Sequence, residues 1–500
     1  MSRPVRVRFA PSPTGPLHIG GVRTALFNYL FAKKHNGVFY LRIEDTDQNR
    51  FVPGAEQYIF EALEWLGIAP SETVGKNEKF GPYRQSERKD LYKQYADQLV
   101  NTGWAYYAFD TAEALDNHRK QHEAEGKTFI YNWHNREKLD TSLVISAAET
   151  EKRIANGEAF VIRFKTPVNE TLHLHDIIRG DLKFETNLLD DKVLFKSDGM
   201  PTYHLANIVD DHLMETSHVI RGEEWLPSMP LHSLLYKAFG WEAPEFAHLP
   251  LILKPIGNGK LSKRDGDKMG FPVFPLEWKS EEGISSGYRE KGFFPEAVVN
   301  FLALLGWNDG TDQEIFSLEE LAQKFDLNRV HKAGAKFDPE KNKWFNHHYL
   351  QQQSDEHLAE AFAPTLAEKG ISTALDVTKV VSLIKERADF VADFWDLADY
   401  FFVAPTAYDE KAAKNWKEDT PNLMQQLISV LENIGDFTSV NIETIVKDWM
   451  TKNEIGMGKV MQPFRLSLVG ALKGPHLFDI VELIGKDETI KRLEKAIATL

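Results

Sequence analysis

The chain has 500 residues, and its 59 lysines and arginines against 74 aspartates and glutamates give a formal net charge of −15. This charge argues against a protein that coats nucleic acid by bulk positive charge, although a local basic groove remains possible. The sequence holds no cysteine, which excludes disulfides and thiolate zinc sites. It has no stretch of ~18 apolar residues for a membrane helix and no signal-peptide core before the first strand pattern. We therefore expect a cytoplasmic, multidomain protein without a membrane partner.

The first fifty residues predict one βαβ unit. Apolar residues alternate with arginines over residues 5–9, which is the period of a strand, and the proline-rich stretch 11–16 ends that strand. Apolar residues then recur over 22–30 with the spacing of one helical face, and a second buried strand follows at 38–41. A strand, a helix and a strand of these lengths favour a parallel sheet with a right-handed crossover.

The middle of the chain predicts a sheet domain that an insertion interrupts. Helical patterns extend from Pro53 to Trp104, and short alternating strands around polar helices follow from about Ala105 to Asp191. Strand patterns return at 193–195 and 218–220, before a helical run from Leu226 to Phe239. We interpret these segments as one doubly wound α/β domain with a parallel, Rossmann-type sheet, split in two by an α+β module.

The C-terminal part of the chain predicts helices. Gly257-Asn258-Gly259 is a hairpin turn signal, and from about Pro295 nearly every apolar pattern has the helical period. We therefore expect the last third to be all-α. The helical patterns cover residues 298–305, 318–325, 377–402, 423–434 and 490–500.

A glycine-rich turn between the first strand and the first helix is the first candidate for ligand binding. The unpaired N–H groups and partial positive charge of a helix N-terminus suit a phosphate, and Gly20 and Gly21 leave room for a nucleotide near the backbone. His18 lies just ahead of them and could donate to a phosphate oxygen. The sequence patterns of dinucleotide-binding and P-loop folds are missing. At this point a turn that binds nothing stays an alternative.

A basic segment after the hairpin turn is the second candidate. Lys260 and Lys263 are three residues apart with Ser262 between them, and two such ammonium groups can clamp a triphosphate as movable point charges. A five-residue basic run on its own more often forms a solvated face. Its chemical meaning therefore depends on a partner, which the turn at His18 would supply.

The segments Arg8–Gly21 and Lys260–Arg264 together resemble the paired signature motifs of class I aminoacyl-tRNA synthetases. Further segments are similar, more narrowly, to the bacterial glutamyl-tRNA synthetase family, in the same order and over nearly the whole chain. Several long motifs in one order make the resemblance very specific. These further segments are Arg42–Asp47, Gly81–Ser86, Lys196–Asn207, Arg221–Trp225, Gln462–Arg465 and Leu483–Asp487.

The resemblance implies a ligase that activates L-glutamate with ATP to glutamyl-adenylate and transfers it to the 3′-terminal adenosine of tRNA(Glu). A carboxylate that attacks the α-phosphate needs little proton transfer, so alignment and neutralisation of charge carry the chemistry, with Mg²⁺ arriving on ATP. The resemblance assigns His18, Lys260 and Lys263 as catalytic residues. It places ATP against Thr14, His18, Gly20 and Lys263.

The amino-acid pocket follows from the resemblance and from the charges of glutamate. Glutamate brings one ammonium and two carboxylates, so a fitting pocket needs one acid and at least one guanidinium. Glu44 can take the ammonium, and Arg8 and Arg221 the carboxylates; taken singly, each is more often an ordinary surface charge. Tyr203 and Asn207 would share a face if their segment is helical. The full set by resemblance is Arg8, Ser12, Glu44, Tyr203, Asn207 and Arg221.

We expect no metal ligands in the chain itself. Asp210, Asp211 and His212 are adjacent, so at most two of them can face one point, and His173, His175 and Asp176 more often pack or hydrogen-bond locally. Some relatives carry a cysteine-rich zinc site in the inserted module. Here aromatic residues at 106–109 occupy that neighbourhood, so no structural zinc is expected and aromatic packing must replace it.

The resemblance also implies a plan of five parts and a monomer. Basic residues such as Lys385, Arg387 and Arg465 could contact tRNA, although most are ordinary solvated charges. The five parts are residues 1–104, the first half of the catalytic domain; 105–191, a module for the acceptor end; 192–254, the second catalytic half; 255–336, a stem-contact region with the basic segment; and 337–500, a helical anticodon-binding region.

Alternative functions differ in the acceptor or lack the chemistry. A transferase that modifies a tRNA base would lack the helical C-terminal region, and a glutaminyl-tRNA synthetase would carry β-barrel character there. An unrelated nucleotidylyltransferase would explain only the first motif. A catalytically silent RNA-binding relative conflicts with the intact His18, Glu44 and Lys263. The sequence leaves open whether tRNA(Gln) is charged as well as tRNA(Glu).

Overall fold

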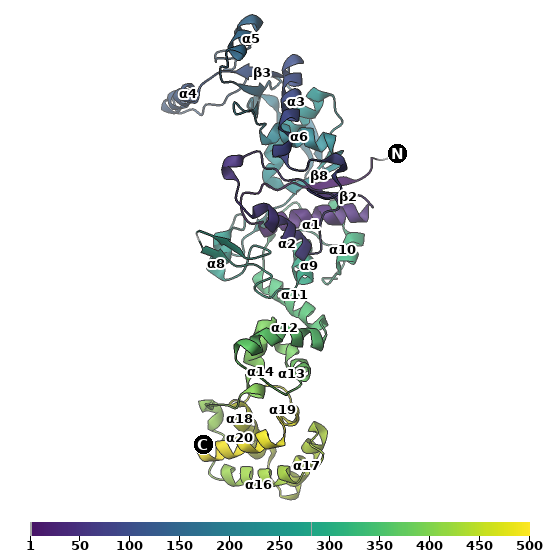
Figure 1. The fold of residues 1–500 in the computed structure, drawn as a ribbon, viewed down its shortest axis with the longest axis vertical. Coiled ribbons are helices and arrows are strands. Elements are labelled where there is room, and N and C mark those ends of the chain that lie inside the picture. Colours follow the sequence, from purple (N-terminus) through teal and green to yellow (C-terminus); the bar gives the residue numbers. More distant parts are fainter. Residues whose placement is uncertain (1–2, 282) are drawn as a thin grey trace. The chain divides into compact units, whose positions relative to one another are not determined.

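The computed structural model describes residues 3–281 and 283–500, and the chain divides into two compact units (Figure 1). The first unit comprises Met1–Lys291 and Pro295–Pro339, and the second comprises Gly292–Phe294 and Glu340–Leu500. The border expected at residue 337 lies close to Pro339, and the other expected borders fall inside the first unit. All five expected parts stay predictions.

The N-terminal βαβ unit is present as predicted. Strands β1 (Arg6–Phe9) and β2 (Val38–Leu41) pair in parallel, and helix α1 (Ile19–Lys34) connects them. The prolines that precede α1 cannot continue the strand ladder. The apolar face of α1 is buried, which accounts for the helical period in the sequence.

Strand β8 (His218–Gly222) lies next to β1 and continues the layer, although the two strands belong to separate hydrogen-bonded sheets. The Ser217 N–H donates to the Arg6 carbonyl at 2.9 Å where the two strands begin. Strand β9 (Glu245–Leu249) is parallel to β8, β5 (Thr171–Asp176) is parallel to β9, and β6 (Gly180–Glu185) is antiparallel to β5. The spatial order is therefore β2, β1, β8, β9, β5, β6.

Helices cover both faces of this sheet, as the doubly wound prediction requires. In Figure 1, α1 lies on one side of β2 and β8, and α6 (Tyr203–Leu213) lies on the other. Helices α3 (Lys89–Asn101), α6 and α7 (Met229–Phe239) share one apolar core with residues of β8 and β9.

A second sheet corrects the sequence-based assignment of strands. Strands β3 (Ala105–Ala108), β4 (Val161–Phe164) and β7 (Val193–Phe195) form an antiparallel sheet, so placing 193–195 in the doubly wound sheet was wrong. Conversely, β5 and β6 come from the expected insertion but pair with the doubly wound sheet. Alternation reveals which residues face a core, not which strand is the neighbour. Helices α4 (Ala112–Ala124) and α5 (Ala147–Ala155) also belong to this stretch.

The helical prediction for Pro53–Trp104 is correct only at its two ends. Helix α2 (Ala55–Trp65) and helix α3 are separated by turns and short 3-10 segments. Gly67 and Gly75 have positive φ angles of 69° and 72° there, and Pro70 and Pro82 interrupt any helix.

The turn at 257–259 is a hairpin, as predicted. Leu253 and Lys260 pair across it, and Gly257 and Gly259 adopt positive φ angles of 80° and 113°. The basic segment that follows is not wholly a loop, because Lys263 begins helix α8 (Lys263–Met269). The remaining elements of this unit are β10 (Ile252–Leu253), β11 (Trp278–Ser280), β12 (Gly283–Ser285), α9 (Pro295–Leu304), α10 (Leu318–Lys324) and β13 (Ala335–Lys336).

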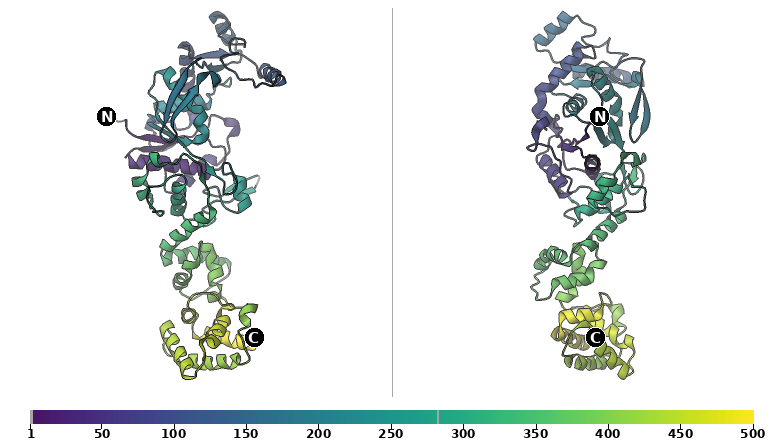
Figure 2. Two further views of the ribbon diagram at one scale, coloured as in Figure 1. Left: turned by 180° about the vertical axis from the view of Figure 1, so that it is seen from behind. Right: turned by 90° about the vertical axis from the view of Figure 1, so that its right-hand side faces the viewer.

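The second unit is helical in the part of the chain described after Lys336, which confirms the all-α prediction (Figure 2). Its apolar core draws on nearly every helix. The pattern at 377–402 is two helices instead of one, because charged residues and two 3-10 turns interrupt it. The helices are α11 (Pro339–Gln352), α12 (Asp355–Glu368), α13 (Val377–Ile384), α14 (Phe394–Phe402), α15 (Glu410–Ala413), α16 (Thr420–Glu432), α17 (Ser439–Lys452), α18 (Met457–Val469), α19 (Leu477–Ile484) and α20 (Lys486–Thr499).

Short 3-10 segments complete the structure. They lie at Gln48–Arg50, Glu78–Phe80, Gln85–Arg88, Thr186–Leu188, Glu223–Ser228, Leu327–Arg329, Lys385–Arg387 and Val391–Asp393. Within the described residues, every helix is too short or too polar to cross a bilayer.

Candidate active site

A cavity of about 1560 Å³ opens in the first unit where β1, β2 and β8 end. In open α/β sheets, ligands bind outside the carboxyl ends of the strands. Every residue that the sequence assigns to ATP or glutamate lines this cavity. These residues are Arg8, Ser12, Thr14, His18, Gly20, Glu44, Tyr203, Asn207, Arg221, Lys260 and Lys263.

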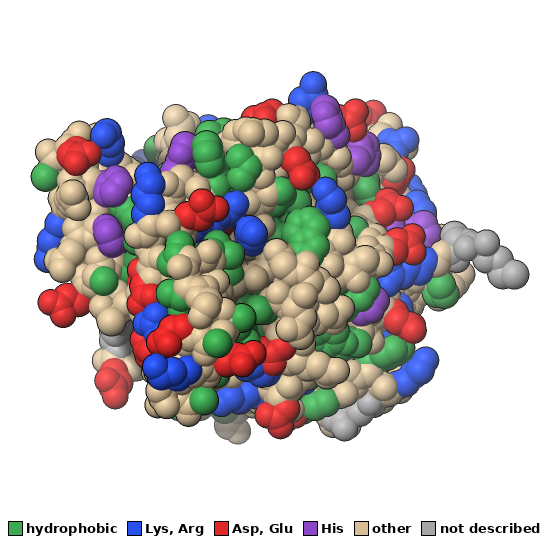
Figure 3. Space-filling view, turned by 90° about the horizontal axis from the view of Figure 1, so that it is seen from above, with side chains coloured by type: hydrophobic (Ala, Val, Ile, Leu, Met, Phe, Trp, Pro, Cys, Tyr) green, Lys and Arg blue, Asp and Glu red, His purple; other side chains and the backbone are tan. Residues whose placement is uncertain are grey.

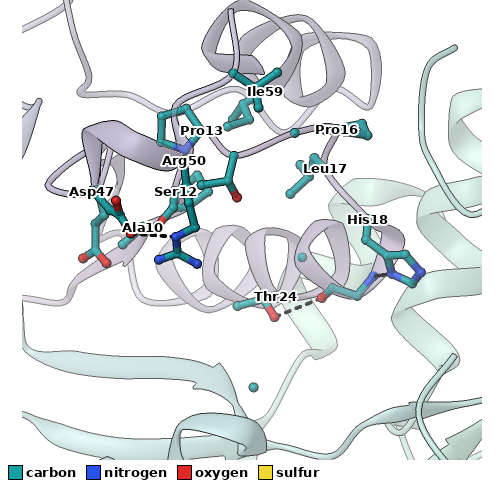
Figure 4. A pocket seen from close by; sticks show the side chains of 18 of the residues that line it. Ala10, Ser12, Pro13, Pro16, Leu17, His18, Thr24, Asp47, Arg50 and Ile59 are labelled. Carbon is teal, nitrogen blue, oxygen red and sulfur yellow. Dashed lines mark hydrogen bonds and ion pairs between the residues drawn. The ribbon is translucent and has the colours of Figure 1, made fainter. Parts of the chain in front are cut away.

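His18 lies at the N-terminus of α1, at one end of the cavity (Figure 4). Its Nδ1 accepts a hydrogen bond from the Gly20 N–H at 3.1 Å, so the proton of the neutral ring is on Nε2. Burial, together with the positive charge of Lys260, lowers the pKa of His18 to about 4. Nε2 is buried and makes no hydrogen bond with the described residues. His18 therefore presents an unused N–H donor.

The two glycines after His18 differ in what they do. A side chain at Gly20 would meet only His18 Nδ1, at an ordinary 3.5 Å. A side chain at Gly21 would lie 2.7 Å from Leu17 Cδ1, so the Leu17 side chain would have to shift. Of the two glycines expected to leave room for a nucleotide, Gly20 is the one with no close contact beside it.

The basic segment reaches the same cavity from α8. The Asp265 carboxylate accepts hydrogen bonds from the Ser262 N–H at 2.9 Å and the Ser262 hydroxyl at 2.6 Å, which fixes the first turn of α8. Lys263, the first residue of α8, forms no ion pair with the described residues. Lys260 Nζ lies 2.8 Å from Glu224 Oε1, and both side chains are about half exposed.

Arg8 and Glu44 each have a buried partner of opposite charge. Arg8 donates through Nε and Nη2 to both carboxylate oxygens of Asp211, at 3.0 and 3.1 Å. Arg42 joins the two pairs, because it donates to Asp211 at 2.8 Å and to Glu44 at 2.9 Å. Burial alone would raise the pKa of Asp211, but Arg8 and Arg42 outweigh burial and hold it below its usual value.

Glu44 also touches the helix that carries the rest of this pocket. Asn207 of α6 donates to Glu44 Oε1 at 3.2 Å. Burial raises the pKa of Glu44, and Arg42 counteracts part of that effect. Tyr203 and Asn207 share one face of α6, as the spacing predicts.

Arg221 at the end of β8 differs from Arg8 in its partners. Its Nε donates to His248 at 3.0 Å, and its Nη1 donates to the Tyr203 hydroxyl at 3.0 Å and to His232 at 3.3 Å. No carboxylate of the described residues forms an ion pair with Arg221, so its partners orient the guanidinium without neutralising it.

The outer part of the cavity is more exposed. Ser12 and Thr14 are exposed, and the Thr14 N–H donates to the Ser12 carbonyl at 2.9 Å. Asp47 and Arg50 form an ion pair at 2.6 Å beside them, with the Arg50 guanidinium directed toward the cavity (Figure 4).

Sequence reasoning missed Arg42 and assigned no role to Asp210 and Asp211. Asp210 accepts from Arg88 at 2.7 Å and from Gln85 and Tyr92, while Asp211 holds Arg8 and Arg42. The two aspartates are therefore ion-pair partners. Among the described residues, no three acidic or histidine side chains are placed to hold a metal ion together. The helical spacing of Asn207, Asp210 and Asp211 was the signal that could have found them.

Two family models match the chain. The model described as "tRNA synthetases class I (E and Q), catalytic domain" matches residues 4–344, and the model described as "Anticodon binding domain" matches residues 352–497. The chain is 85% identical over 501 residues to the glutamate–tRNA ligase of Flavobacterium johnsoniae, with 100% of both chains covered. It is 64% identical over 504 residues to the glutamate–tRNA ligase of Christiangramia forsetii, again with 100% of both covered.

Two crystal structures are similar to the chain over 99% of its length. A glutamate tRNA ligase from Elizabethkingia meningosepticum in complex with its amino acid has a TM-score of 0.97 at 54% identity, with 99% of that chain covered. The glutamate-tRNA synthetase from Elizabethkingia anophelis has a TM-score of 0.95 at 54% identity, with 100% of that chain covered. The chain belongs to the glutamate–tRNA ligases, a family of class I aminoacyl-tRNA synthetases.

Proposed function

We propose that the chain activates L-glutamate with ATP to glutamyl-adenylate and transfers the glutamyl group to the 3′-terminal adenosine of tRNA(Glu). The similarity to glutamate–tRNA ligases over the full length supports this reaction. The observation that carries it is one cavity lined by both signature segments, with His18 on α1 and Lys263 on α8. The compartment is proposed to be the cytoplasm, and the enzyme a monomer.

The ATP end of the cavity offers donors for phosphate oxygens. His18 Nε2–H has no partner and Lys263 no ion pair among the described residues, so each is available to an anion without breaking a bond. Lys260 would exchange Glu224 for a phosphate oxygen. Thr14 and Gly20 would flank the nucleotide, and Mg²⁺ would arrive with ATP. These groups align the reactants and neutralise the charge that develops on the phosphates.

The charges at the other end of the cavity fit glutamate. Arg8, Arg42, Arg88 and Arg221 carry four positive charges. Their acidic partners Glu44, Asp210 and Asp211, counted as ionised, carry three negative ones, which leaves 4 − 3 = +1. Glutamate has two carboxylates and one ammonium, so its net charge of −1 matches this surplus. Arg221 supplies the surplus because no carboxylate pairs with it.

The same surplus would favour glutamate over glutamine. An amide in place of the side-chain carboxylate loses a charge-assisted hydrogen bond, worth on the order of 1.5–3 kcal/mol. At about 1.4 kcal/mol per tenfold change, this loss corresponds to roughly one to two orders of magnitude. The pocket would also keep its unmatched positive charge with glutamine bound.

The tRNA partner is proposed from the second unit and the insertion. An anticodon-binding family model matches residues 352–497, which supports contact of the helical unit with the anticodon. Residues 105–191 are proposed to hold the acceptor end, and 255–336 to contact the stem. Residues 1–104 and 192–254 would then be the two halves of the catalytic domain.

Charging with radiolabelled glutamate, measured on purified tRNA(Glu) and tRNA(Gln), tests the proposed function. We expect charging of tRNA(Glu) that depends on ATP, and nearly silent ATP–pyrophosphate exchange when tRNA is left out. Charging of tRNA(Gln) as well would identify a non-discriminating enzyme. Binding of tRNA without any charging would identify a silent RNA-binding relative and overturn the proposal.

A further inference from the structure

A buried row of side chains holds Arg221 from the side away from the cavity. Asp176 Oδ2 lies 2.6 Å from His248 Nδ1, and His248 Nε2 accepts from Arg221 Nε at 3.0 Å. On the other side, His232 Nδ1 accepts from Arg221 Nη1 at 3.3 Å, and His232 Nε2 lies 3.2 Å from His204 Nδ1. Asp176, His232 and His248 are each 0% exposed.

The hydrogen bonds fix the tautomer of each imidazole. A guanidinium only donates, so the ring nitrogen that faces Arg221 must be an acceptor in both histidines. His248 therefore carries its proton on Nδ1 and donates it to Asp176, while His232 carries its proton on Nε2 and donates it to His204. Burial lowers the pKa of both His232 and His248, which agrees with neutral rings.

Backbone N–H groups hold both carboxylate oxygens of Asp176 in place, so its orientation toward His248 is fixed. Its Oδ1 accepts from the N–H groups of Ile178 at 3.0 Å and Arg179 at 2.8 Å, and its Oδ2 accepts from the His248 N–H at 3.1 Å. Asp176 lies at the end of β5 and His248 on β9, and the parallel pairing of Asp176 with Phe246 brings them together. Neither carboxylate oxygen of Asp176 can turn away without losing a backbone partner.

We propose that Asp176 and His248 are positioning residues that orient the Arg221 guanidinium for a glutamate carboxylate while leaving its charge unpaired. Arg221 must be held in one orientation and must also keep its positive charge available, and these two requirements explain why its Nε meets an imidazole. A carboxylate beside Arg221 would orient it but also neutralise it, as Asp211 does for Arg8. An apolar side chain would leave the charge available but Nε without a partner, so that only the bonds of Nη1 and Nη2 would orient the guanidinium. The neutral acceptor at His248, fixed by Asp176, satisfies both requirements. This inference rests on the proposed function, because it assumes that Arg221 binds glutamate.

The variant Asp176→Asn reverses the hydrogen bond at its source. The Asn oxygen must stay with the two backbone donors that Oδ1 serves, so the amide NH₂ replaces Oδ2 and faces His248. His248 Nδ1 then becomes the acceptor, and its Nε2–H opposes Arg221 Nε–H, as a carboxylate-to-amide change behind a histidine is known to do. We expect the KM for glutamate to rise at least tenfold, with the KM values for ATP and tRNA within about twofold of wild type.

Two variants at His248 test whether a hydrogen-bond acceptor at this position is sufficient to keep glutamate binding. In His248→Gln, the amide oxygen takes the place of Nε2 and still accepts from Arg221, so we expect the KM for glutamate to stay within about threefold of wild type. In His248→Leu, Arg221 Nε has no acceptor, while the bonds of Nη1 to Tyr203 and His232 remain, and we expect the same rise as in Asp176→Asn. Calorimetric binding of glutamate to the full-length protein, without ATP or tRNA, provides a second readout that should follow the KM values.

Asp191→Asn is the matched control. Asp191 is also 0% exposed and accepts from Tyr106, Arg136 and the Thr166 N–H, but its hydrogen bonds do not involve Arg221, His232 or His248. We expect it to lower thermal stability as much as Asp176→Asn, with an unchanged KM for glutamate. A rise in the KM for glutamate in Asp191→Asn would mean that general loss of stability causes the effect.

The outcomes separate this inference from the proposed function. If the wild-type protein neither binds glutamate nor charges tRNA with it, the proposed function fails. If the wild-type protein charges tRNA while Asp176→Asn and His248→Leu keep its KM for glutamate, the positioning role is wrong. The role is also wrong if His248→Gln loses as much as His248→Leu, or if the KM for ATP rises equally. Should Asp176→Asn not fold, the comparison of the two His248 variants decides.

Discussion

Arg8 and Arg221 line the same cavity, but removing each one has a different effect on stability, because Arg8 has a charged partner and Arg221 has neutral ones. Arg8→Ala breaks a buried ion pair, which typically costs roughly 3–5 kcal/mol, although Arg42 still contacts Asp211 at 2.8 Å. Arg221→Ala leaves only neutral acceptors unpaired, at about 1–3 kcal/mol. We expect both variants to raise the KM for glutamate at least tenfold and the KM for ATP less than threefold.

Thermal unfolding distinguishes the two variants further, because Arg8→Ala should lower the melting temperature more than Arg221→Ala. Steady-state kinetics with glutamate and ATP varied in turn provide the rest of the measurement. An unchanged apparent affinity for glutamate in Arg8→Ala would contradict the role that we propose for Arg8.

His18 allows a prediction about pH. Burial and Lys260 lower its pKa to about 4, whereas the unfolded chain has the ordinary value of 6.5. The unfolded state therefore binds more protons between these values, so this group contributes its full stability above pH 6.5 and loses it as the pH falls toward 4. We expect the His18 imidazole NMR signal, assigned by its loss in His18→Gln, to keep its neutral shift from pH 8 to pH 5. A titration midpoint near 6.5 would contradict the buried, neutral ring.

The sequence was sufficient to predict a set of residues that line one cavity, but not the residues that hold them from behind. His18, Glu44, Arg221 and Lys263 belong to motifs with local spacing, and all of them line one cavity. Asp176 and His248 are 72 residues apart and meet only because β5 and β9 are neighbours. Nothing in the spacing of a strand reveals its neighbour, so the local packing expected for Asp176 missed its partner.

At the level of elements, α8 is a short helix that depends on its first turn. It has seven residues, and Asp265 holds Ser262 through both the N–H and the hydroxyl. Loss of such a cap costs about 0.5–2 kcal/mol, enough to fray a helix of two turns. We expect Asp265→Ala to raise the KM for ATP severalfold through a less ordered Lys263, while the KM for glutamate stays the same.

Helix α10 supplies the control for this prediction. It also has seven residues, and Glu320 accepts from the Ser317 N–H at 2.8 Å in the same arrangement. Glu320→Ala should remove a similar capping energy without any change in the KM for ATP. Equal effects of the two variants on the KM for ATP would show that stability, not the order of Lys263, is responsible.

Helices with a long, regular apolar pattern could be predicted from the sequence. The sheet to which a short strand belongs could not, because it depends on a neighbouring strand far away in the chain. The apolar face of α1 and the helices of the second unit gave clear patterns, and the structure contains them. The whole stretch from Pro53 to Trp104 was predicted to be helical from a pattern that belongs to α2, with Glu56, Glu61 and Glu64 on one side and Leu63 inside. The prolines and glycines between α2 and α3 exclude a helix there. Strand β7 was assigned to the wrong sheet because its sequence does not reveal that it pairs with β4.

For the whole molecule, an acidic protein must bind an acidic partner. The net charge is −15, and Figure 3 shows acidic and basic side chains interspersed over the face in view, without one sign covering it. Binding of tRNA therefore relies on local contacts of lysines and arginines with phosphates, which release counterions. We expect the Kd for tRNA to rise steeply between about 50 and 200 mM salt in filter-binding measurements.

Glutamate binding provides the comparison in the same salt series. The partners proposed for its charges, such as Arg8 and Glu44, are buried, and buried pairs are screened much less than exposed ones. We expect the Kd for glutamate to change only slightly over this range. A Kd for tRNA that does not depend on salt would argue that RNA is not the partner.

The pairing of β5 with β9 has a consequence for chimaeras between members of this family. Residues 105–191 look like a cassette that could be exchanged, but they contain β5, β6 and Asp176. Exchange of this cassette would leave β9 as an open sheet edge unless the donor supplied a strand of matching register. It would also place the donor's counterpart of Asp176 beside the host's His248. The affinity of such a hybrid for its amino acid would then depend on whether these two residues still form their hydrogen bond.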